Sequence, residues 1–516
     1  MRGARTIGIR ARATVAFAAM ALVLGGSAGT AHAGLLGTLT APVTGLLEVV
    51  TAGWDDGVTT APVSMATVAD AIGADDLWAR GVDGSGVGVA LIDSGVVPVD
   101  GLDGDGKVVN GPDLSFESQA ADYRYLDTFG HGTHMAGIIA GNDDGSFRGV
   151  APGARLVNLK VGARDGATDV SQVIAAIDWV VQHRDDPGLG IRVLNLAYGT
   201  DSMQDYRLDP LTKAVEEAAR HGIVVVVSGG NDGSDRPSLV SPATDPYVLA
   251  VGAVNLKGTA SVLDDVVAPF SSRGSASRSV DLVAPGVSIT SLRDPGSTID
   301  TEHPSAVVAE RFFRGSGTSQ AAAVVSGAAA LLLDARPDLT PDQVKRLLTN
   351  TATPLLLAGG RAQGAGRINV NLASLAPKPL FATQSFAPAT GLGSLEAARG
   401  TSHVADEGVE LTGEIDIMSS PWDAATWAAR AEDGAAWNGG SWNGADWTGD
   451  CFCALSWAGS SWEGRTWTGR TWTGRTWTAD DWTGRTWTGR TWTGRTWTGR
   501  TWTGRTWTGR TWTSPA

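Results

Sequence analysis

Short apolar runs alternate with stretches of helical spacing through the middle of this chain. The runs are apolar on both faces, and Ile223–Val227 consists of β-branched residues throughout. Such runs are typical of parallel strands that helices cover on both sides. The strand runs are 87–92, 156–161, 191–196, 223–227 and 248–254, with helical spacing at 170–183 and 211–220. The sequence therefore predicts an α/β domain with a mainly parallel sheet and helices on both faces.

The N-terminus has the layout of an export signal. Four arginines precede an apolar run over 14–24, and small residues follow, ending at Ala31-His32-Ala33. This order predicts a signal peptide over 1–33, cleaved after Ala33, and hence a secreted, extracellular protein. The run is too short to span a bilayer, so we expect no transmembrane segment in the mature chain.

Composition divides the remaining residues into four parts. Residues 34–64 are rich in Gly, Thr, Leu and Val and are expected to be a short extension or reduced pro-segment. The compact domain is expected over 65–376. Residues 377–420 are rich in Ala, Pro, Ser and Gly and predict a linker, and residues 421–516 are a repetitive tail.

The charge is unevenly distributed. The formal net charge is −14; residues 1–33 carry +4 and residues 461–516 carry +6, which leaves −24 on the remainder. An acidic body of this kind argues against nucleic acid as a partner. Only two cysteines occur, Cys451 and Cys453, so no disulfide framework supports the domain and the redox state of this pair stays open.

A glycine-rich loop at 315–317 leads into a long Ala/Leu helix that begins near Ser319. The N–H groups of a first helical turn have no helical partner, and the helix dipole places positive charge there. A serine at this place can act as a nucleophile beside an oxyanion. By itself the stretch is also compatible with a simple helix cap.

Three further polar residues lie where a parallel sheet forms its sites. Asp93 ends an apolar run, Asn231 follows the Val-rich run, and His131 opens a helical stretch. The carboxyl ends of parallel strands meet at one edge of a sheet. Asp93 and Asn231 could instead be turn residues. His131 and His134 could instead bind a metal, for which no third ligand is evident, or be neutral structural histidines.

Together these stretches resemble the motifs of the subtilisin-like serine proteases. The aspartate motif is similar to 91–95, the histidine motif to 130–137 and the serine motif to 317–321, and the order Asp, His, Asn, Ser is the family's order. The likeness covers about 65–372. It implies a serine endopeptidase acting on protein or peptide substrates, with a triad of Asp93, His131 and Ser319 and with Asn231 as oxyanion donor.

The resemblance also implies two main-chain rims that pair with an extended substrate. These are Ala197, Tyr198 and Gly199 on one side and Ser228, Gly229 and Gly230 on the other. Val240 is expected near the primary specificity pocket. Gln320 stands where the family most often has Met. No cofactor is required; many relatives bind structural calcium, for which no ligands can be assigned here.

The tail has a period of five residues. Trp recurs at every fifth position from Trp422 to Trp512, except at Glu432 and Phe452. A square β-solenoid would place every Trp alike, but Arg470 and its equivalents stand where such a repeat needs a small residue, which favours a low-complexity tail. Trp stacks on sugar rings and Arg pairs with anions, so cell-wall glycan or an anionic polymer is a candidate partner. The alternative is a disordered or self-associating tail without such a partner.

Two other functions compete with the protease. One is a non-catalytic secreted protein that binds a surface through its Trp/Arg tail; it would be expected to have lost one of the four site residues. The other is a lipase-type hydrolase, which needs a Gly-x-Ser-x-Gly elbow followed by its acid and histidine. The sequence offers no such arrangement, and it leaves the side-chain preference and the physiological substrate open.

Overall fold

The structure is a computed structural model of the whole chain. It describes residues 53–54, residues 61–447 apart from 119, 144, 236–237 and 407–408, and short strands between 461 and 507. The chain divides into Met1–Pro42 and Val43–Ala516. The expected signal peptide, most of the 34–64 extension and the Cys451–Cys453 pair lie outside the described residues.

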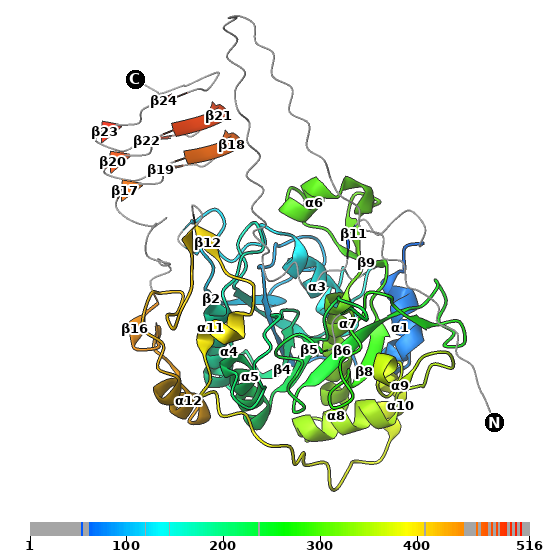
Figure 1. Cartoon of the computed structure of the whole chain (residues 1–516). Coiled ribbons are helices and arrows are strands. Elements are labelled where there is room, and N and C mark those ends of the chain that lie inside the picture. The colour runs from blue at the N-terminus through cyan, green and yellow to red at the C-terminus, as the bar shows by residue number, and fades with distance from the viewer. Residues whose placement is uncertain are drawn as a thin grey trace, which may run out of the picture. The chain divides into compact units, whose positions relative to one another are not determined.

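A mainly parallel sheet of eight strands forms the centre of the domain (Figure 1). Its order is β2-β3-β1-β4-β5-β6-β7, with β8 also paired to β6; only β7 runs antiparallel to its neighbour. The strands are β1 (Gly88–Asp93), β2 (Val108–Asp113), β3 (Arg155–Lys160), β4 (Ile191–Leu196), β5 (Val224–Ser228), β6 (Leu249–Asn255), β7 (Val266–Val267) and β8 (Leu282–Pro285).

The five strands predicted from apolar runs are all present. Each is buried almost throughout, which is why both of its faces are apolar. The sequence reading missed β2, whose Asn110 and Gly111 interrupt the run, and the four-residue β8. The predicted fold class is confirmed.

Helices cover both faces of the sheet (Figure 1). The pair α4 (Val170–His183) and α5 (Pro210–Arg220) packs on one face, and α3 (His131–Ala140) with α7 (Thr318–Ala335) packs on the other. Further helices are α1 (Met65–Ile72), α2 (Ala74–Trp78), α8 (Pro341–Asn350), α9 (Gly360–Gln363) and α10 (Val370–Leu375). Asp169 starts α4 and Thr340 starts α8, each through a capping box.

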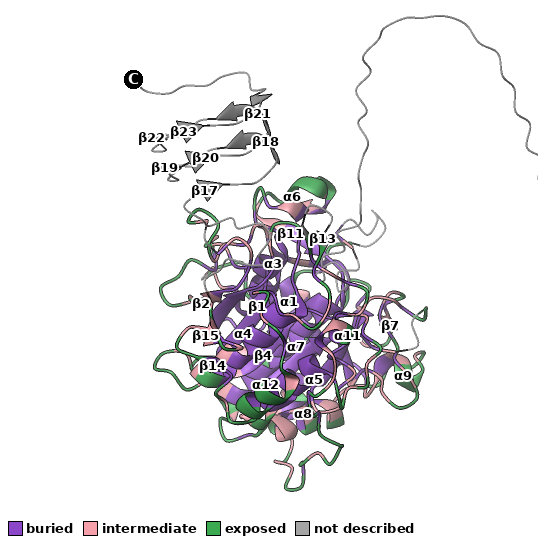
Figure 2. Cartoon of the chain, turned by 60° about the vertical axis from the view of Figure 1, so that its left-hand side comes forward, coloured by how far each residue is buried: buried purple, intermediate pink, exposed green. Residues whose placement is uncertain are grey.

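Figure 2 shows that the central strands and α7 are buried. Among the described residues, α7 is the one helix long and apolar enough to cross a membrane, and 89% of its apolar window lies inside the fold. It therefore behaves as the core helix of a globular domain.

A smaller sheet lies next to α3. It consists of β9 (Ile289–Leu292), β10 (Val307–Val308) and β11 (Phe312–Gly315) in the order β10-β11-β9. Between β9 and β10 the chain forms α6 (Thr298–Glu302) and η2 (Pro304–Ala306). Strand β11 leads directly into α7, so this sheet positions the loop that carries Ser319.

Residues 377–447 differ from the linker and tail that composition predicted. They form α11 (Leu395–Arg399), β12 (Ala405–Asp406), β13 (Val409–Glu410), α12 (Ala424–Glu432), β14 (Trp437–Asn438), β15 (Ser441–Trp442) and β16 (Ala445–Asp446). Arg399 is fully buried and donates to Asp169, the cap of α4, at 2.7 Å. The first tryptophans of the tail, Trp422, Trp427, Trp437 and Trp442, join the main hydrophobic core.

The later repeats form short parallel strand pairs. The strands are β17 (Ser461–Trp462), β18 (Thr466–Trp472), β19 (Thr476–Trp477), β20 (Asp481–Trp482), β21 (Thr486–Trp492), β22 (Thr496–Trp497), β23 (Thr501–Trp502) and β24 (Thr506–Trp507). Trp462 pairs with Trp482, and Trp467 with Trp487, so paired residues are twenty apart. Twenty residues are four repeats, which fits a four-sided coil better than the unstructured alternative.

Candidate active site

Asp93 and His131 meet at the carboxyl end of the sheet. Asp93 is the last residue of the central strand β1, and His131 is the first residue of α3. The imidazole Nδ1 lies 2.7 Å from one carboxylate oxygen of Asp93 and 2.9 Å from the other, and both side chains are fully buried. This bond places the Nδ1 proton on the Asp93 side and leaves Nε2 to face away, buried and without a hydrogen-bond partner in the part of the chain that the structure describes.

A second carboxylate, Asp127, fixes this pair, and sequence reasoning missed it. Asp127 accepts hydrogen bonds from the N–H groups of Gly130 and Thr133, at 2.6 and 2.7 Å, in the first turn of α3. It also accepts from the Ser94 hydroxyl at 2.7 Å, next to Asp93. Burial raises the pKa of Asp127 despite these hydrogen bonds. An anion at this helix end holds the start of α3 against the end of β1.

Ser319 is the second residue of α7, as the sequence predicted for a helix N-terminus. The preceding Gly317 occupies the cap position without a side-chain cap, so neither Thr318 nor Ser319 caps the helix. Helices α3 and α7 pack against each other, and the Trp54 ring lies against both His131, at the start of α3, and Gly315, just before α7. Among the described residues, no hydrogen bond joins the Ser319 hydroxyl to His131 Nε2.

Asn231 lies beside this helix start. Its side-chain oxygen accepts from both the N–H and the hydroxyl of Thr318, each at 3.0 Å. This assignment turns its Nδ2 away from Thr318, and Nδ2 is buried without a partner among the described residues. A buried amide donor without an acceptor costs free energy, so its retention at a helix N-terminus points to a ligand that it serves.

The second expected rim is already bonded to the protein itself. The Gly229 N–H donates to Val251 O at 2.9 Å, and the Gly230 N–H donates to Thr318 Oγ1 at 3.2 Å. Since each N–H makes one strong bond, Gly229 and Gly230 line the site as a wall rather than offering donors to a substrate strand. Ser228 ends β5 and is fully buried.

The first rim, Ala197 to Gly199, follows β4 directly. The Tyr198 side chain is fully buried, and its pKa is raised by burial and then by the nearby Asp169 charge, so the phenol points into the fold. Val240 lies between the two rims: a Cβ on Gly199 would sit 2.5 Å from one of its methyl carbons, and a Cβ on Gly230 would sit 2.9 Å from the other. Val240 therefore fills the space between the rims.

A tryptophan from the N-terminal extension packs against the His131 imidazole. The Trp54 ring is 6.0 Å from the His131 ring and 5.2 Å from the His134 ring, edge-on to both. Its neighbour Gly53 accepts a hydrogen bond from the Ser316 N–H at 3.0 Å. The one sequence signal for this contact is an aromatic residue in a segment otherwise made mostly of small and aliphatic residues.

His134 is structural rather than a metal ligand. Its Nε2 bonds the carbonyl of Phe313 at 3.1 Å, and burial lowers its pKa to about 3, so the ring stays neutral. Within the described ranges no group of three or more His, Cys, Asp or Glu side chains could hold a metal ion, so no calcium ligands can be named from them.

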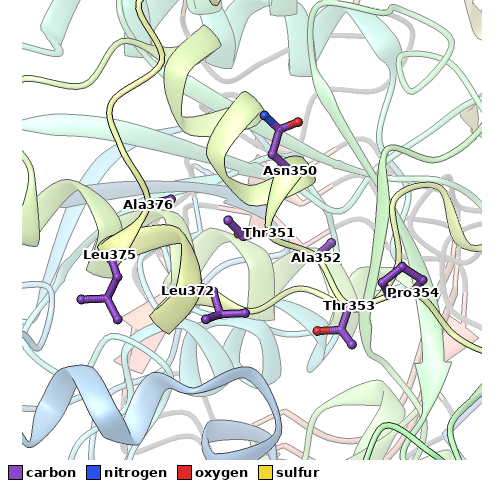
Figure 3. A pocket seen from close by; sticks show the side chains of 8 residues that line it. All are labelled: Asn350, Thr351, Ala352, Thr353, Pro354, Leu372, Leu375 and Ala376. Carbon is purple, nitrogen blue, oxygen red and sulfur yellow. The ribbon is translucent and has the colours of Figure 1, made fainter.

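A surface hollow elsewhere has different chemistry. It lies between the C-terminal end of α8 and α10 and is lined by Asn350, Thr351, Ala352, Thr353, Pro354, Leu372, Leu375 and Ala376 (Figure 3). None of these side chains ionises at ordinary pH, so the hollow offers no acid, base or strong nucleophile.

Comparison with known proteins agrees with this geometry. The Subtilase family model matches residues 84–371. Serine protease AprX of Bacillus subtilis (strain 168) is 39% identical over 295 residues, which is 55% of this chain and 65% of AprX. Subtilisin DY of Bacillus licheniformis is 35% identical over 306 residues, covering 59% of this chain and 96% of that protein.

A solved structure is also similar. Fervidolysin from Fervidobacterium pennivorans, described as a keratinolytic enzyme related to subtilisin, aligns at 30% identity with a TM-score of 0.48, over 60% of this chain and 45% of that chain. The family assignment rests on the sequence matches, which span the strands and helices that carry Asp93, His131, Asn231 and Ser319. The chain belongs to the subtilase family of serine peptidases.

Proposed function

We propose that the chain is a secreted serine endopeptidase that cleaves peptide bonds with Ser319 as nucleophile. The observation that carries the proposal is the Asp93–His131 pair, whose second imidazole nitrogen is left without a partner beside the helix that carries Ser319. Export is supported by the charged, apolar and small-residue order of residues 1–33.

The chemistry follows from these positions. Ser319 Oγ attacks the scissile carbonyl carbon while its proton passes to His131 Nε2. Asp93 holds the Nδ1 proton and stabilises the imidazolium that forms. His131 then gives the proton to the leaving amine, the acyl-enzyme remains on Ser319, and water enters by the same steps in reverse.

Asn231 supplies the second donor to the oxyanion. Its Nδ2 is held ready because Thr318 occupies the amide oxygen, and the Ser319 N–H at the start of α7 supplies the other donor. Asn231→Ala is then expected to lower kcat by about 10²–10³-fold with little change in KM, measured with a peptide ester. An unchanged kcat would remove Asn231 from the mechanism.

The nucleophile is tested with a fluorophosphonate probe that reacts with activated serines. We expect covalent labelling of the full chain and none of Ser319→Ala, with Ser326→Ala as the matched control because Ser326 lies in the same helix and bonds Asn195. Equal labelling of the wild-type chain and Ser319→Ala would refute Ser319 as the nucleophile, and no labelling of either would favour the alternative, a non-catalytic surface-binding protein.

The tail-binding expectation now concerns only the repeats after Trp447, because the earlier indoles are packed inside the fold. We propose cell-wall glycan or an anionic polymer as their partner, on the strength of the repeated Arg and Trp. Retention of the full chain on purified cell wall, compared with a chain ending at residue 447, is the measurement that checks it.

A further inference from the structure

Trp54 occupies a pocket with its own hydrophobic lining. It forms a small buried cluster with Phe129, Ile299, Ala306 and Phe313, separate from the main core. The ring is 5% exposed and lies 5.6 Å from the Phe313 ring. These residues come from the loop before α3, from α6 and η2, and from β11, so the pocket is made by the elements that flank the triad.

The floor of this pocket is a glycine. A Cβ on Gly315 would lie 2.7 Å from the Trp54 ring, which means that the indole fits only because position 315 has no side chain. A flat aromatic ring over a glycine, edge-on to two imidazoles, is a built side-chain site rather than an accidental surface contact.

The pocket lies on the leaving-group side of the scissile bond. The two expected rims at 197–199 and 228–230 would hold the acyl part of a substrate, and neither contributes to this cluster. His131 must protonate the departing amine, so residues after the scissile bond leave past its imidazole. Trp54 touches that imidazole, which places its ring where the side chain of such a residue would lie.

The three residues expected to form the triad are buried, and Trp54 lies against one of them, His131. Asp93, His131 and Ser319 all have 0% exposure, and a protease with a covered imidazole cannot receive a peptide bond. The one backbone link described between this segment and the active-site loop is the single bridge between Gly53 and Ser316. A link of this size, joined to a cluster outside the main core, can open without unfolding the domain.

We propose that Phe129, Ile299, Ala306, Phe313 and Gly315 form an aromatic-accepting pocket for a substrate residue after the scissile bond, and that Trp54 is its resident occupant. A peptide substrate enters when Trp54 leaves. The inference rests on the proposed function, because it assigns a substrate preference to the same active site.

The first experiment measures the rate of fluorophosphonate labelling of the full chain. Trp54→Ala is expected to label at least about tenfold faster than wild type. This ratio corresponds to a free-energy difference of roughly 1.4 kcal/mol between the pocket with Trp54 bound and the open pocket. Trp179→Ala is the matched control, because that indole stacks on His183 in α4 and should leave the rate unchanged.

Gly315→Ala provides an independent route to the same result. Its new methyl group meets the Trp54 ring, while its other close neighbour, the Gln320 amide, is the end of a flexible side chain. It should accelerate labelling in the wild-type background and give no further gain in Trp54→Ala. A synthetic peptide of residues 43–64 should slow the labelling of Trp54→Ala, and the same peptide with Ala at position 54 should not.

The second experiment compares two quenched peptides that differ only after the scissile bond, with Trp or Ala. For the Trp54→Ala variant, kcat/KM for the Trp peptide should be at least about tenfold higher than kcat/KM for the Ala peptide. Equal labelling rates of wild type, Trp54→Ala and Gly315→Ala would refute the claim that Trp54 blocks the active site. Equal cleavage of the two peptides would refute the claim that the pocket prefers an aromatic residue. No labelling of either wild type or Trp54→Ala would instead overturn the proposed function.

Discussion

Tryptophans pack on the protease domain in two places, and the two sites differ in how firmly they are built. At the back of the domain, Trp427 and Trp442 are almost fully buried in the main core, and both indole N–H groups donate to Asp178 on α4, at 2.8 and 2.7 Å. At the front, Trp54 belongs to a cluster of five buried residues that touches the catalytic histidine.

The difference separates structural from exchangeable packing. An indole that is buried in the core and hydrogen-bonded at its N–H leaves only when the surrounding structure unfolds. An indole in a small peripheral cluster can leave alone. Tryptophan therefore stabilises the fold at α4, where Trp427 and Trp442 pack. By our inference, Trp54 instead controls the access of substrate to the active site.

The largest expected effect is the loss of a back-face indole. Trp442→Ala removes a fully buried ring and takes one donor from Asp178, so it should lower the free energy of unfolding by about 3–5 kcal/mol, measured by urea denaturation. Trp54→Ala should cost less than half as much, because its cluster is separate from the main core.

The distinction between the two tryptophan sites is wrong if Trp442→Ala and Trp54→Ala lower the free energy of unfolding equally. An equal loss would mean that the N-terminal segment is as much part of the folded domain as the Trp422–Trp447 region. The denaturant slope should also stay unchanged in both variants if each unfolds as one cooperative unit.

A smaller effect concerns pH. Burial and, to a lesser extent, the charge of Glu217 on α5 together raise the pKa of Asp178 to about 7, against the hydrogen bonds from Trp427 and Trp442. The unfolded carboxyl has a pKa near 3.9, so the folded state holds the proton more tightly. The contribution of protonated Asp178 to the free energy of unfolding is therefore fully present below about pH 4. It is lost as the pH rises to about 7, and the loss amounts to roughly 2–4 kcal/mol.

Asp178→Asn isolates this contribution, because it keeps an acceptor for the indoles and cannot ionise. Buried Asp209, Asp245, Asp265 and Asp294 also have raised pKa values and weaken the wild-type fold in the same direction. The informative quantity is therefore the difference between the two proteins in urea midpoint at pH 5 and pH 8. Parallel pH curves would show that Asp178 does not titrate in this range.

Sequence reasoning worked best where one local signal decides the structure. Ile223–Val227 predicts a buried strand because β-branched residues leave no polar face, and β5 lies there. Asp93 and His131 could be named because the motifs and their order along the chain agree with the family's, and the structure joins the two side chains at 2.7 Å.

Sequence reasoning worked worst where a single partner far along the chain determines whether a segment folds onto the domain. Residues 377–420 have the composition of a linker, but Arg399 is buried because Asp169, 230 residues earlier, accepts its guanidinium. Composition counts side chains and does not show which one finds a buried partner. Trp54 was missed for the same reason, because its ring contacts lie in His131, His134 and Phe313. Asp127 was missed although two of its partners, Gly130 and Thr133, are close in sequence.

The twenty-residue pairing of the late repeats sets a rule for how this tail can vary in length. Removing or adding four units keeps every later strand beside the same kind of neighbour, so the coil is only shortened or lengthened. Removing a single unit would turn everything after it by one side of the square. Variants of this tail should therefore tolerate changes in whole turns and resist changes of one repeat.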